Sequence, residues 1–261
     1  TLGKAACCNL SESFETNASV SVSYADAVTG SKQIQLLGLA GNYVQTNVEN
    51  VPSIRGLKST YGLNYLPGTW IKSIDLAKGT ISVVNGYESM AGAINVELAK
   101  PDTSEVYYLN TYTNSQGRFE INQQGAHRFN SRLSTGLFTH YSQQVSRIDG
   151  NKDGFLDLPL FNLVNVLNRW KYATDRWMIQ WGANYLLEDR LGGQNGIESN
   201  SDRYKIYGFG SKTERLETFA KIARLYPEKP YQGLALILST ANHSNDYYFA
   251  MKNYRGREQN V

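Results

Sequence analysis

The pattern of apolar and polar positions divides the chain into two parts with different textures. Up to residue 100, short apolar runs are separated by glycine-containing turns, at 18–24, 33–39, 43–48, 71–76 and 93–98. Runs of this length predict short strands of a compact domain. After Pro101 the runs become longer and alternate strictly between apolar and polar residues. We therefore predict a mixed α/β domain at residues 1–100 and a strand domain at residues 101–261.

The alternation after Pro101 is clearest between residues 177 and 188. One face carries apolar residues and the other mostly polar ones: Trp177, Ile179, Trp181, Ala183 and Tyr185 against Gln180, Asn184 and Glu188. The same pattern occurs at 132–142, and at 215–222 the polar face carries Arg215, Glu217 and Lys221. A soluble sandwich also alternates, but it seldom places files of charge opposite its apolar face. Long strands with aromatic ends favour a membrane barrel wall, with the apolar face toward lipid.

About seven strands of this kind can be counted. They lie near residues 104–113, 117–129, 132–142, 161–173, 176–188, 213–226 and 231–241. Seven strands cannot close around a domain of 100 residues, because barrel diameter grows with strand number. An open edge in lipid would also leave backbone groups unpaired. We expect the chain to cover only part of a transmembrane antiparallel β-barrel, and to begin in mid-domain at Thr1 without a signal peptide.

Composition narrows the classes of function. The net charge of +3 in 261 residues indicates no nucleic-acid partner, and no run approaches the ~18 apolar residues of a transmembrane helix. The two cysteines, Cys7 and Cys8, are adjacent, as buried thiols or a strained vicinal pair, and the three histidines are isolated. No nucleophile, acid–base pair or phosphate-binding loop is visible, so we predict that the chain is not an enzyme.

The stretch from Trp70 to Glu97 carries a specific pattern. Its spaced residues are Ile74, Lys78, Gly79, Ser82, Gly86, Gly92, Ile94, Asn95 and Val96. Read physically, it is a strand, a glycine turn, a short connection, a second glycine turn and a strand. The pattern resembles the C-terminal half of the plug domain of TonB-dependent outer-membrane receptors. Thr80 stands where that family often has proline, and Ser89 where it often has alanine.

This resemblance implies a plug inside a barrel of about 22 strands, of which the chain would cover about a third. It also implies import of a scarce ligand, such as a ferric siderophore, haem, cobalamin or a metal complex, through plug displacement driven by TonB and its inner-membrane energising complex. Outer-membrane lipid and a surface lipoprotein are further implied partners. The details are similar to the siderophore and cobalamin receptors of Bacteroidetes. The alternative is a plugged barrel without transport, such as a surface receptor, an adhesin or a subunit of a larger outer-membrane assembly.

One family feature is replaced. In the family, an Ile-Arg-Gly segment helps to lock plug to barrel by charge pairs, and by spacing Leu36-Leu37-Gly38 occupies its place. By spacing, Asn50-Val51-Pro52 corresponds to the end of the family's next strand. Ile54-Arg55-Gly56 comes after it and therefore does not correspond to the family's Ile-Arg-Gly segment. A lock of that kind is therefore not expected at Leu37.

The segment 53–68 is rich in glycine and tyrosine. By family position it would face a bound ligand at the outer apex of the plug, and its candidate contacts are Arg55, Tyr61, Asn64 and Tyr65. Rigid tyrosines and an arginine suit an oxygen-rich anionic ligand. The alternative is a plain connection whose tyrosines pack against the inside of the barrel.

One candidate metal loop lies between two predicted strands. Oxygen donors alternate at Asp149, Asn151, Asp153, the carbonyl of Phe155, and Asp157, with Gly154 at the turn. This spacing is typical of calcium loops, although an EF-hand's final Glu is replaced by Leu160. Calcium is the one cofactor predicted, and a plain turn rich in Asp, Asn and Gly is the equal alternative.

Overall fold

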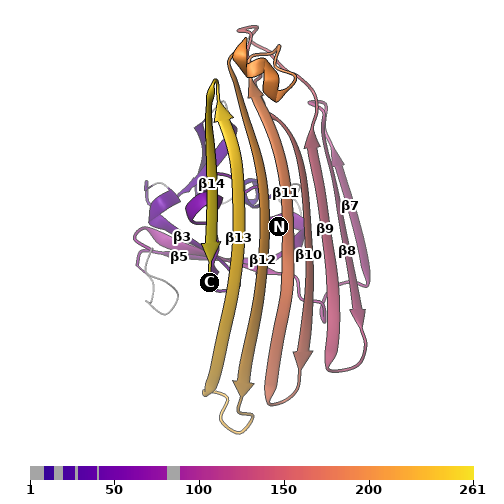
Figure 1. The fold of residues 1–261 in the computed structure, drawn as a ribbon. Coiled ribbons are helices and arrows are strands. Elements are labelled where there is room, and N and C mark those ends of the chain that lie inside the picture. The colour runs from indigo at the N-terminus through magenta and orange to yellow at the C-terminus, as the bar shows by residue number, and fades with distance from the viewer. Residues whose placement is uncertain (1–8, 15–19, 27–28, 40, 81–88) are drawn as a thin grey trace.

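The computed structural model describes residues 9–14, 20–26, 29–39, 41–80 and 89–261. The strands form a two-stranded sheet (β1-β2), a four-stranded sheet (β4-β3-β6-β5) and an eight-stranded sheet running from β14 to β7. We call the eight-stranded sheet the wall, and the described part up to residue 100 the plug. Figure 1 shows the wall as one long curved sheet with the plug behind it. In these described ranges, no helix is long and apolar enough to span a membrane.

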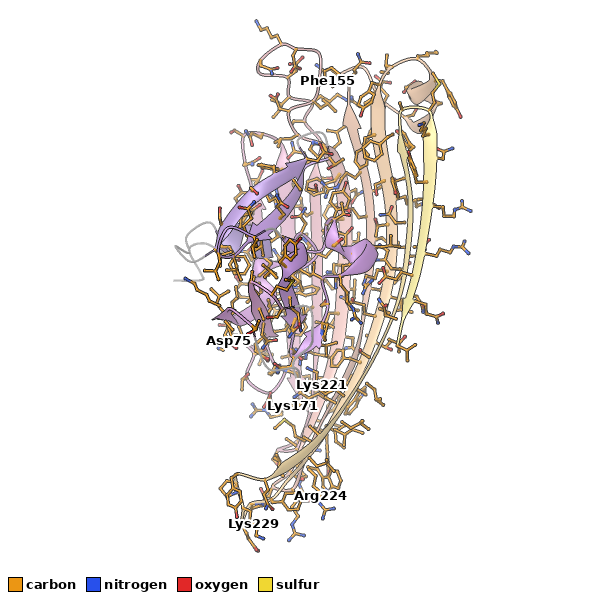
Figure 2. The ribbon with its side chains drawn as sticks, turned by 90° about the vertical axis from the view of Figure 1, so that its left-hand side faces the viewer. Asp75, Phe155, Lys171, Lys221, Arg224 and Lys229 are labelled. Atoms are coloured by element: carbon orange, nitrogen blue, oxygen red, sulfur yellow. The ribbon has the colours of Figure 1, made fainter. Side chains whose placement is uncertain are left out.

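The wall is antiparallel, and each strand pairs with its neighbour in sequence. Its strands are β7 (Tyr107–Thr113), β8 (Arg118–Arg128), β9 (Leu133–Gln144), β10 (Leu160–Ala173), β11 (Trp177–Gly193), β12 (Gly208–Leu225), β13 (Gly233–Phe249) and β14 (Lys252–Asn260). Two long loops, 145–159 and 194–207, lie at the upper end, and the second contains the short helix η5 (Asn200–Tyr204). Figure 2 shows Phe155 at this upper end and Lys229 at the lower end.

The described wall has eight strands, which corrects the predicted count of seven. The additional strand is β14, whose outward positions carry Asn253, Arg255 and Arg257 rather than apolar residues. Strands β11, β12 and β13 also extend further upward than predicted. Their upper outward positions include Asp189, Lys212, Asn242 and Asp246, which interrupt the apolar alternation, so a search for it ends too early.

The plug consists mostly of short strands with single helical turns. Its elements are α2 (Leu10–Ser13), β1 (Ser21–Asp26), β2 (Ser31–Gln35), η1 (Gly41–Tyr43), β3 (Val44–Val48), β4 (Val51–Pro52), η2 (Gly56–Ser59), η3 (Gly68–Trp70), β5 (Ile71–Lys78) and β6 (Gly92–Leu98). Strand β6 pairs in parallel with β3 and antiparallel with β5. The mixed plug and antiparallel wall follow the predicted fold class, with very little helix. The predicted boundary, Pro101, falls between the end of β6 and the start of β7.

The core of the plug includes side chains of the wall. Trp70 is 1% exposed and meets Phe138 of β9 edge-on, with ring centroids 5.9 Å apart. Leu167 of β10 belongs to the same buried cluster. In a second cluster, Tyr61 and Tyr65 pack with three wall residues, Leu163, Leu186 and Phe209. Because apolar surface is shared in this way, the plug and wall stabilise each other.

The two faces of the wall differ as the alternation predicts. Trp177, Trp181 and Tyr185 point away from the plug and are 41%, 37% and 38% exposed. Glu188 and Arg190, at intervening positions of β11, are buried against the plug. Figure 2 shows that the plug occupies the concave side of the wall. The outward face therefore has the apolar texture suited to lipid.

We expect the substitution Ile179→Arg to destabilise the membrane-inserted protein by about 2–4 kcal/mol, because Ile179 lies on the outward face between Tyr172 and Ile222. The measurement is denaturant unfolding in lipid vesicles. Asn242→Arg is the matched control, since Asn242 is outward but lies near the upper edge of the apolar band, where about 0–1 kcal/mol is expected. Equal effects of the two substitutions would contradict a lipid-facing band.

Candidate functional site: the plug–wall interface

A strained turn at the tip of β3 brings an acidic side chain to the wall. Glu49 and Asn50 both have left-handed backbone conformations, with φ of 52° and 64°. Two such residues suit a tight hairpin, but the conformation is unfavourable for Glu. The turn is held because the backbone N–H of Asn50 donates to Asn95 Oδ1 at 2.8 Å, and that of Glu49 donates to the oxygen of Val96 at 2.8 Å. The position of the Glu49 side chain explains why a costly residue occupies this turn.

The carboxylate of Glu49 is surrounded by three cations. Arg169 of β10 donates through Nη1 at 2.7 Å and through Nη2 at 3.2 Å. Lys221 of β12 approaches at 3.2 Å, and Lys100 approaches at 2.5 Å from the segment that joins plug to wall. Glu49 is 5% exposed and Arg169 is 1% exposed. One plug side chain is thus tied to two wall strands by buried charge.

These cations determine the protonation of Glu49. Burial by itself raises the pKa of the carboxyl group, but Arg169, Lys100 and Lys221 together outweigh it and lower the pKa from 4.5 to about 2. A lowered pKa in the folded state means that the ionised form stabilises the fold. This contribution is complete above about pH 4.5 and is lost as the pH falls toward 2.

A second ionic contact between plug and wall is made by η2. Lys58 of η2 is 4% exposed and donates to Glu217 of β12 at 2.8 Å. Arg215 donates to the same carboxylate oxygen at 2.7 Å through Nε, and its Nη1 donates to His243 Nδ1 at 2.9 Å. Burial lowers the pKa of Lys58, and Glu217 opposes that effect. The plug supplies the cation here and the anion at Glu49, so the two contacts have opposite polarity.

The same plug segment is clamped to the last wall strand. The backbone N–H of Leu57 donates to Glu258 Oε2 of β14 at 2.6 Å. Gly56 has φ +57°, and a Cβ at this position would collide with the Glu258 carboxylate. The left-handed backbone favours glycine at residue 56, and a larger residue there would also displace the Glu258 carboxylate.

Two tyrosines of the plug are buried against β11. The hydroxyl group of Tyr65 donates to Glu188 Oε2 at 2.9 Å, and Arg190 binds the other oxygen of Glu188 at 2.5 Å. The Arg190 guanidinium lies 4.5 Å from the ring centroid of Tyr61. Burial raises the pKa of Tyr61 to about 12 and raises that of Tyr65 well above 10. Both hydroxyl groups therefore remain protonated at neutral pH.

A fifth contact joins the first helix, α2, to β8. Arg118 donates to Glu12 of α2 at 2.8 Å and to Glu120 at 2.6 Å. A cavity of about 180 Å³ lies beside this contact, between the plug and strands β8 to β11. Asn64 of the plug lines the cavity together with His140. Polar side chains thus line the space between plug and wall at this level.

The structure does not bring the four predicted ligand contacts together on one surface. Tyr61 and Tyr65 are 4% and 3% exposed, so their expected place on an apical contact surface is corrected to the plug–wall interface. Asn64 lines the cavity just described, and Arg55 lines a separate cavity beside β12 and β13. The physical reason is that segment 53–68 folds back along the wall, where burial of two large rings is favourable. A ligand contact by Arg55 or Asn64 stays a prediction.

The predicted plug-motif residues have structural roles where they are described. Gly79, at φ +83°, follows Lys78 at the end of β5, and Gly92 begins β6 where a Cβ would meet the backbone of Ala77. Asn95 secures the Glu49 turn. Ser82 and Gly86 lie outside the described residues, as do Cys7 and Cys8.

Leu37, at the place of the family arginine, is 65% exposed in a tight turn with φ 53°. It makes no charge pair, and the charged lock lies at Glu49 and Lys58 instead.

The candidate calcium loop is closed by its own hydrogen bonds. Asp149 accepts from the backbone of Asp153 and Gly154, and Asp157 accepts from the backbone of Gly150 at 2.8 Å. Phe155 pairs with Gln194 of the other long loop. Within the described ranges, no three acidic, His or Cys side chains gather as a metal-binding group. Calcium binding at this loop stays a prediction.

Sequence analysis missed the residues that form the ionic contacts. Glu49, Lys58 and Arg169 stand alone in sequence, and each partner is far away. The one available signal was the charged inward file Arg215, Glu217 and Lys221 on β12, because charge facing a barrel interior needs partners.

Comparison with known proteins supports this architecture. Residues 2–93 match the family model described as TonB-dependent Receptor Plug Domain. No curated protein matches the chain significantly. The fold and the plug–wall contacts define a plugged antiparallel barrel wall, in which residues 2–93 match the plug domain of TonB-dependent receptors.

Several solved outer-membrane receptors share the fold. The alcaligin outer membrane receptor FauA from Bordetella pertussis has a TM-score of 0.72 at 13% identity, covering 96% of this chain and 39% of that one. The siderophore receptor PiuA from Acinetobacter baumannii has a TM-score of 0.68 at 12% identity, covering 92% and 35%. FpvA of P. aeruginosa, solved with bound pyoverdines, has a TM-score of 0.63 at 11% identity, covering 98% and 43%. The chain thus spans less than half the length of these receptors.

We expect Glu49→Gln to weaken plug–wall association by about 3–5 kcal/mol, because it leaves Arg169 buried without a charged partner. Glu97→Gln is the matched control, since Glu97 also binds Lys100 but is 27% exposed, and less than about 1 kcal/mol is expected. Both are measured by thermal unfolding and by protease cleavage of the plug in detergent.

The pH dependence provides an independent check. Above pH 4.5 the wild-type protein should exceed Glu49→Gln in stability by a constant amount, and the difference should shrink as the pH falls toward 2. A difference that does not change with pH would show that the ionised carboxylate is not the source of the stabilisation.

For the loop at 149–157, the calcium prediction is tested by melting with 1–2 mM CaCl₂, about the extracellular concentration, against excess chelator. Calcium binding would raise the melting temperature of the wild-type protein and leave Asp153→Ala unchanged. No calcium-dependent shift in the wild-type protein would identify the loop as a plain hydrogen-bonded turn.

Proposed function

We propose that the chain is part of a TonB-dependent outer-membrane receptor that imports a small ligand by displacement of the plug. The observation that carries the proposal is the polar character of the plug–wall interface. Five contacts, at Glu12, Glu49, Leu57, Lys58 and Tyr65, join plug to wall through ion pairs or charged hydrogen bonds. Water can replace such contacts when a plug moves, whereas exposure of a continuous apolar interface would cost far more.

The proposed ligand is a ferric siderophore. The support is that FauA, PiuA and FpvA are described as receptors for alcaligin, siderophores and pyoverdines. Arg55 adds a chemical argument, because its side chain lines a cavity and makes no ion pair within the described residues. A guanidinium group suits the carboxylate or catecholate oxygens of such ligands. Haem, cobalamin and other metal complexes, and the similarity to Bacteroidetes receptors, remain hypotheses of lower rank.

The proposed location is the outer membrane, with TonB and its inner-membrane energising complex as partners. The outward aromatic residues support this location, because Phe129, Trp170 and Trp181 stack in a continuous row with centroid spacings of 5.7 and 5.9 Å. Outward aromatic residues of this kind are typical of the membrane-facing surface of a barrel wall. A surface lipoprotein stays a predicted partner, and no chemistry on the ligand is proposed.

The test is accumulation of radiolabelled ferric siderophores by cells that express the full-length protein, with and without TonB. We expect one of the ferric siderophores tested to accumulate only in cells with TonB. We expect Lys58→Met to alter the rate of accumulation, because it removes the contact with Glu217. Binding without accumulation in both strains would contradict import and would favour a surface receptor without transport. Lys229→Met, at the lower rim, is the matched control.

A further inference from the structure

A short segment between β6 and β7, residues 99–104, joins the plug to the wall, and we call it the connector. Its sequence is Ala-Lys-Pro-Asp-Thr-Ser. Proline followed by aspartate favours a tight turn, because proline fixes the backbone angle that the second residue of a turn requires. The sequence of the connector therefore suits a defined turn better than a flexible link.

Hydrogen bonds close this turn on a single carbonyl group. The backbone N–H groups of Thr103 and Ser104 donate to the carbonyl oxygen of Lys100 at 3.1 and 3.0 Å. The hydroxyl group of Ser104 donates to the same oxygen at 2.7 Å. Because serine and threonine hydroxyl groups support turns in this way, the connector holds its shape through its own residues.

Three strands of the wall hold the turn in place. Lys171 of β10 donates to Asp102 Oδ2 at 2.5 Å, and Arg128 of β8 donates to the backbone oxygen of Asp102. Pro101 is buried beside Gly136 of β9, where an added Cβ would lie 3.3 Å from the proline Cβ. Figure 2 places Lys171 near the lower edge of the plug. From Pro101 onward, the connector is thus fastened to the lower part of the wall.

The hydrogen bonding changes sides at the two residues before Pro101. The backbone N–H of Ala99 donates to the oxygen of Trp70 in the plug at 2.9 Å, whereas the oxygen of Ala99 accepts from Arg169 of β10 at 3.2 Å. The side chain of Lys100 binds Glu49 of the plug, whereas its carbonyl group closes the turn that the wall holds. The boundary between plug and wall therefore lies at residues 99 and 100.

We propose that the connector is the fixed pivot of plug displacement. Residues 101–104 stay on β8, β9 and β10 while the plug leaves the wall, and the chain bends at Ala99 and Lys100. Asp102 is the positioning residue of this pivot, because two wall strands donate to it. An anchored end also keeps the displaced plug at a high effective concentration near its place in the wall, which favours its return. The proposal rests on the proposed function and is independent of the ligand that is carried.

The first experiment measures maleimide labelling of single-cysteine variants of the full-length protein in detergent, at increasing urea, with Cys7 and Cys8 replaced by serine. Thr46→Cys reports on the plug, because Thr46 is buried in β3, and Pro101→Cys reports on the connector. We expect Thr46→Cys to react once urea releases the plug, and Pro101→Cys to react only when the wall unfolds. Reaction of both cysteines at the same urea concentration would overturn the proposal.

Removal of the anchor gives a second readout in the same assay. We expect Asp102→Ala to raise the labelling rate of Pro101→Cys about tenfold while the wall is folded, because one charge-assisted hydrogen bond to the turn is lost. Asp175→Ala is the matched control, since Asp175 is an exposed aspartate in the turn between β10 and β11. Equal labelling rates in the two variants would show that Asp102 does not position the connector.

Disulfides test the pivot during transport. Pro101→Cys with Gly136→Cys fastens the connector to β9, since the two Cβ atoms lie 3.3 Å apart, close to the about 3.8 Å of a disulfide. Leu57→Cys with Gly256→Cys fastens η2 to β14, because an added Cβ at Gly256 lies 2.9 Å from the Leu57 side chain.

We expect cells to accumulate ferric siderophore with the first disulfide formed, and to stop with the second until it is reduced. A block by the first disulfide that reduction reverses would overturn the proposal. If the wild-type protein does not import at all, the proposed function has failed, whereas the labelling experiment still decides whether the connector stays on the wall when the plug is released.

Discussion

The interaction on which the rest of the structure depends is the burial of the Glu49 carboxylate among three cations. A carboxylate removed from water is costly unless its charge is balanced. Arg169, Lys100 and Lys221 supply that balance, and they come from β10, from the connecting segment and from β12. The unfavourable turn at Glu49 and Asn50 persists because the surrounding hydrogen bonds hold it in place. The position of the plug in the wall follows from where those cations stand.

Around this contact, the plug–wall interface combines apolar packing with polar contacts. Trp70 and Phe138 join the plug core to the wall, so the two parts share buried area. The contacts of Lys58 with Glu217 and of Tyr65 with Glu188 add specificity, because each forms only in one alignment of plug and wall. An interface with these two components is specific when closed and still separable in steps. Under the proposed function, such an interface would hold the plug firmly and let it be displaced reversibly.

The outward surface of the wall also has an apolar part and a polar part. The apolar band from Trp177 to Tyr185 has the texture of a lipid contact, and charged residues begin immediately above it. The upper strands and the long loops build a polar region beyond this band, where Asp189 and Lys212 line a cavity. The same strands therefore present a charged lumen to the plug, an apolar belt outward, and a polar rim above.

Local sequence was sufficient for features that depend on short-range periodicity. A period of two assigns the faces of residues 177–188 without any knowledge of partners, and the glycines at 79 and 92 mark the end of β5 and the start of β6. The spacing that ends in Val96 was enough to recognise the plug. Sequence did not reveal β14, because its outward positions are polar and the period is hidden.

Only the tertiary structure decided which distant residues meet. Glu49 and Arg169 are separated by 120 positions, and nothing in either neighbourhood indicates the other. Tyr61 and Tyr65 have the composition of a ligand-contact loop, yet burial against Glu188 and Arg190 makes them part of the interface. The reason is physical: periodicity reports which face a side chain occupies, whereas its partner is determined by how the chain packs in three dimensions.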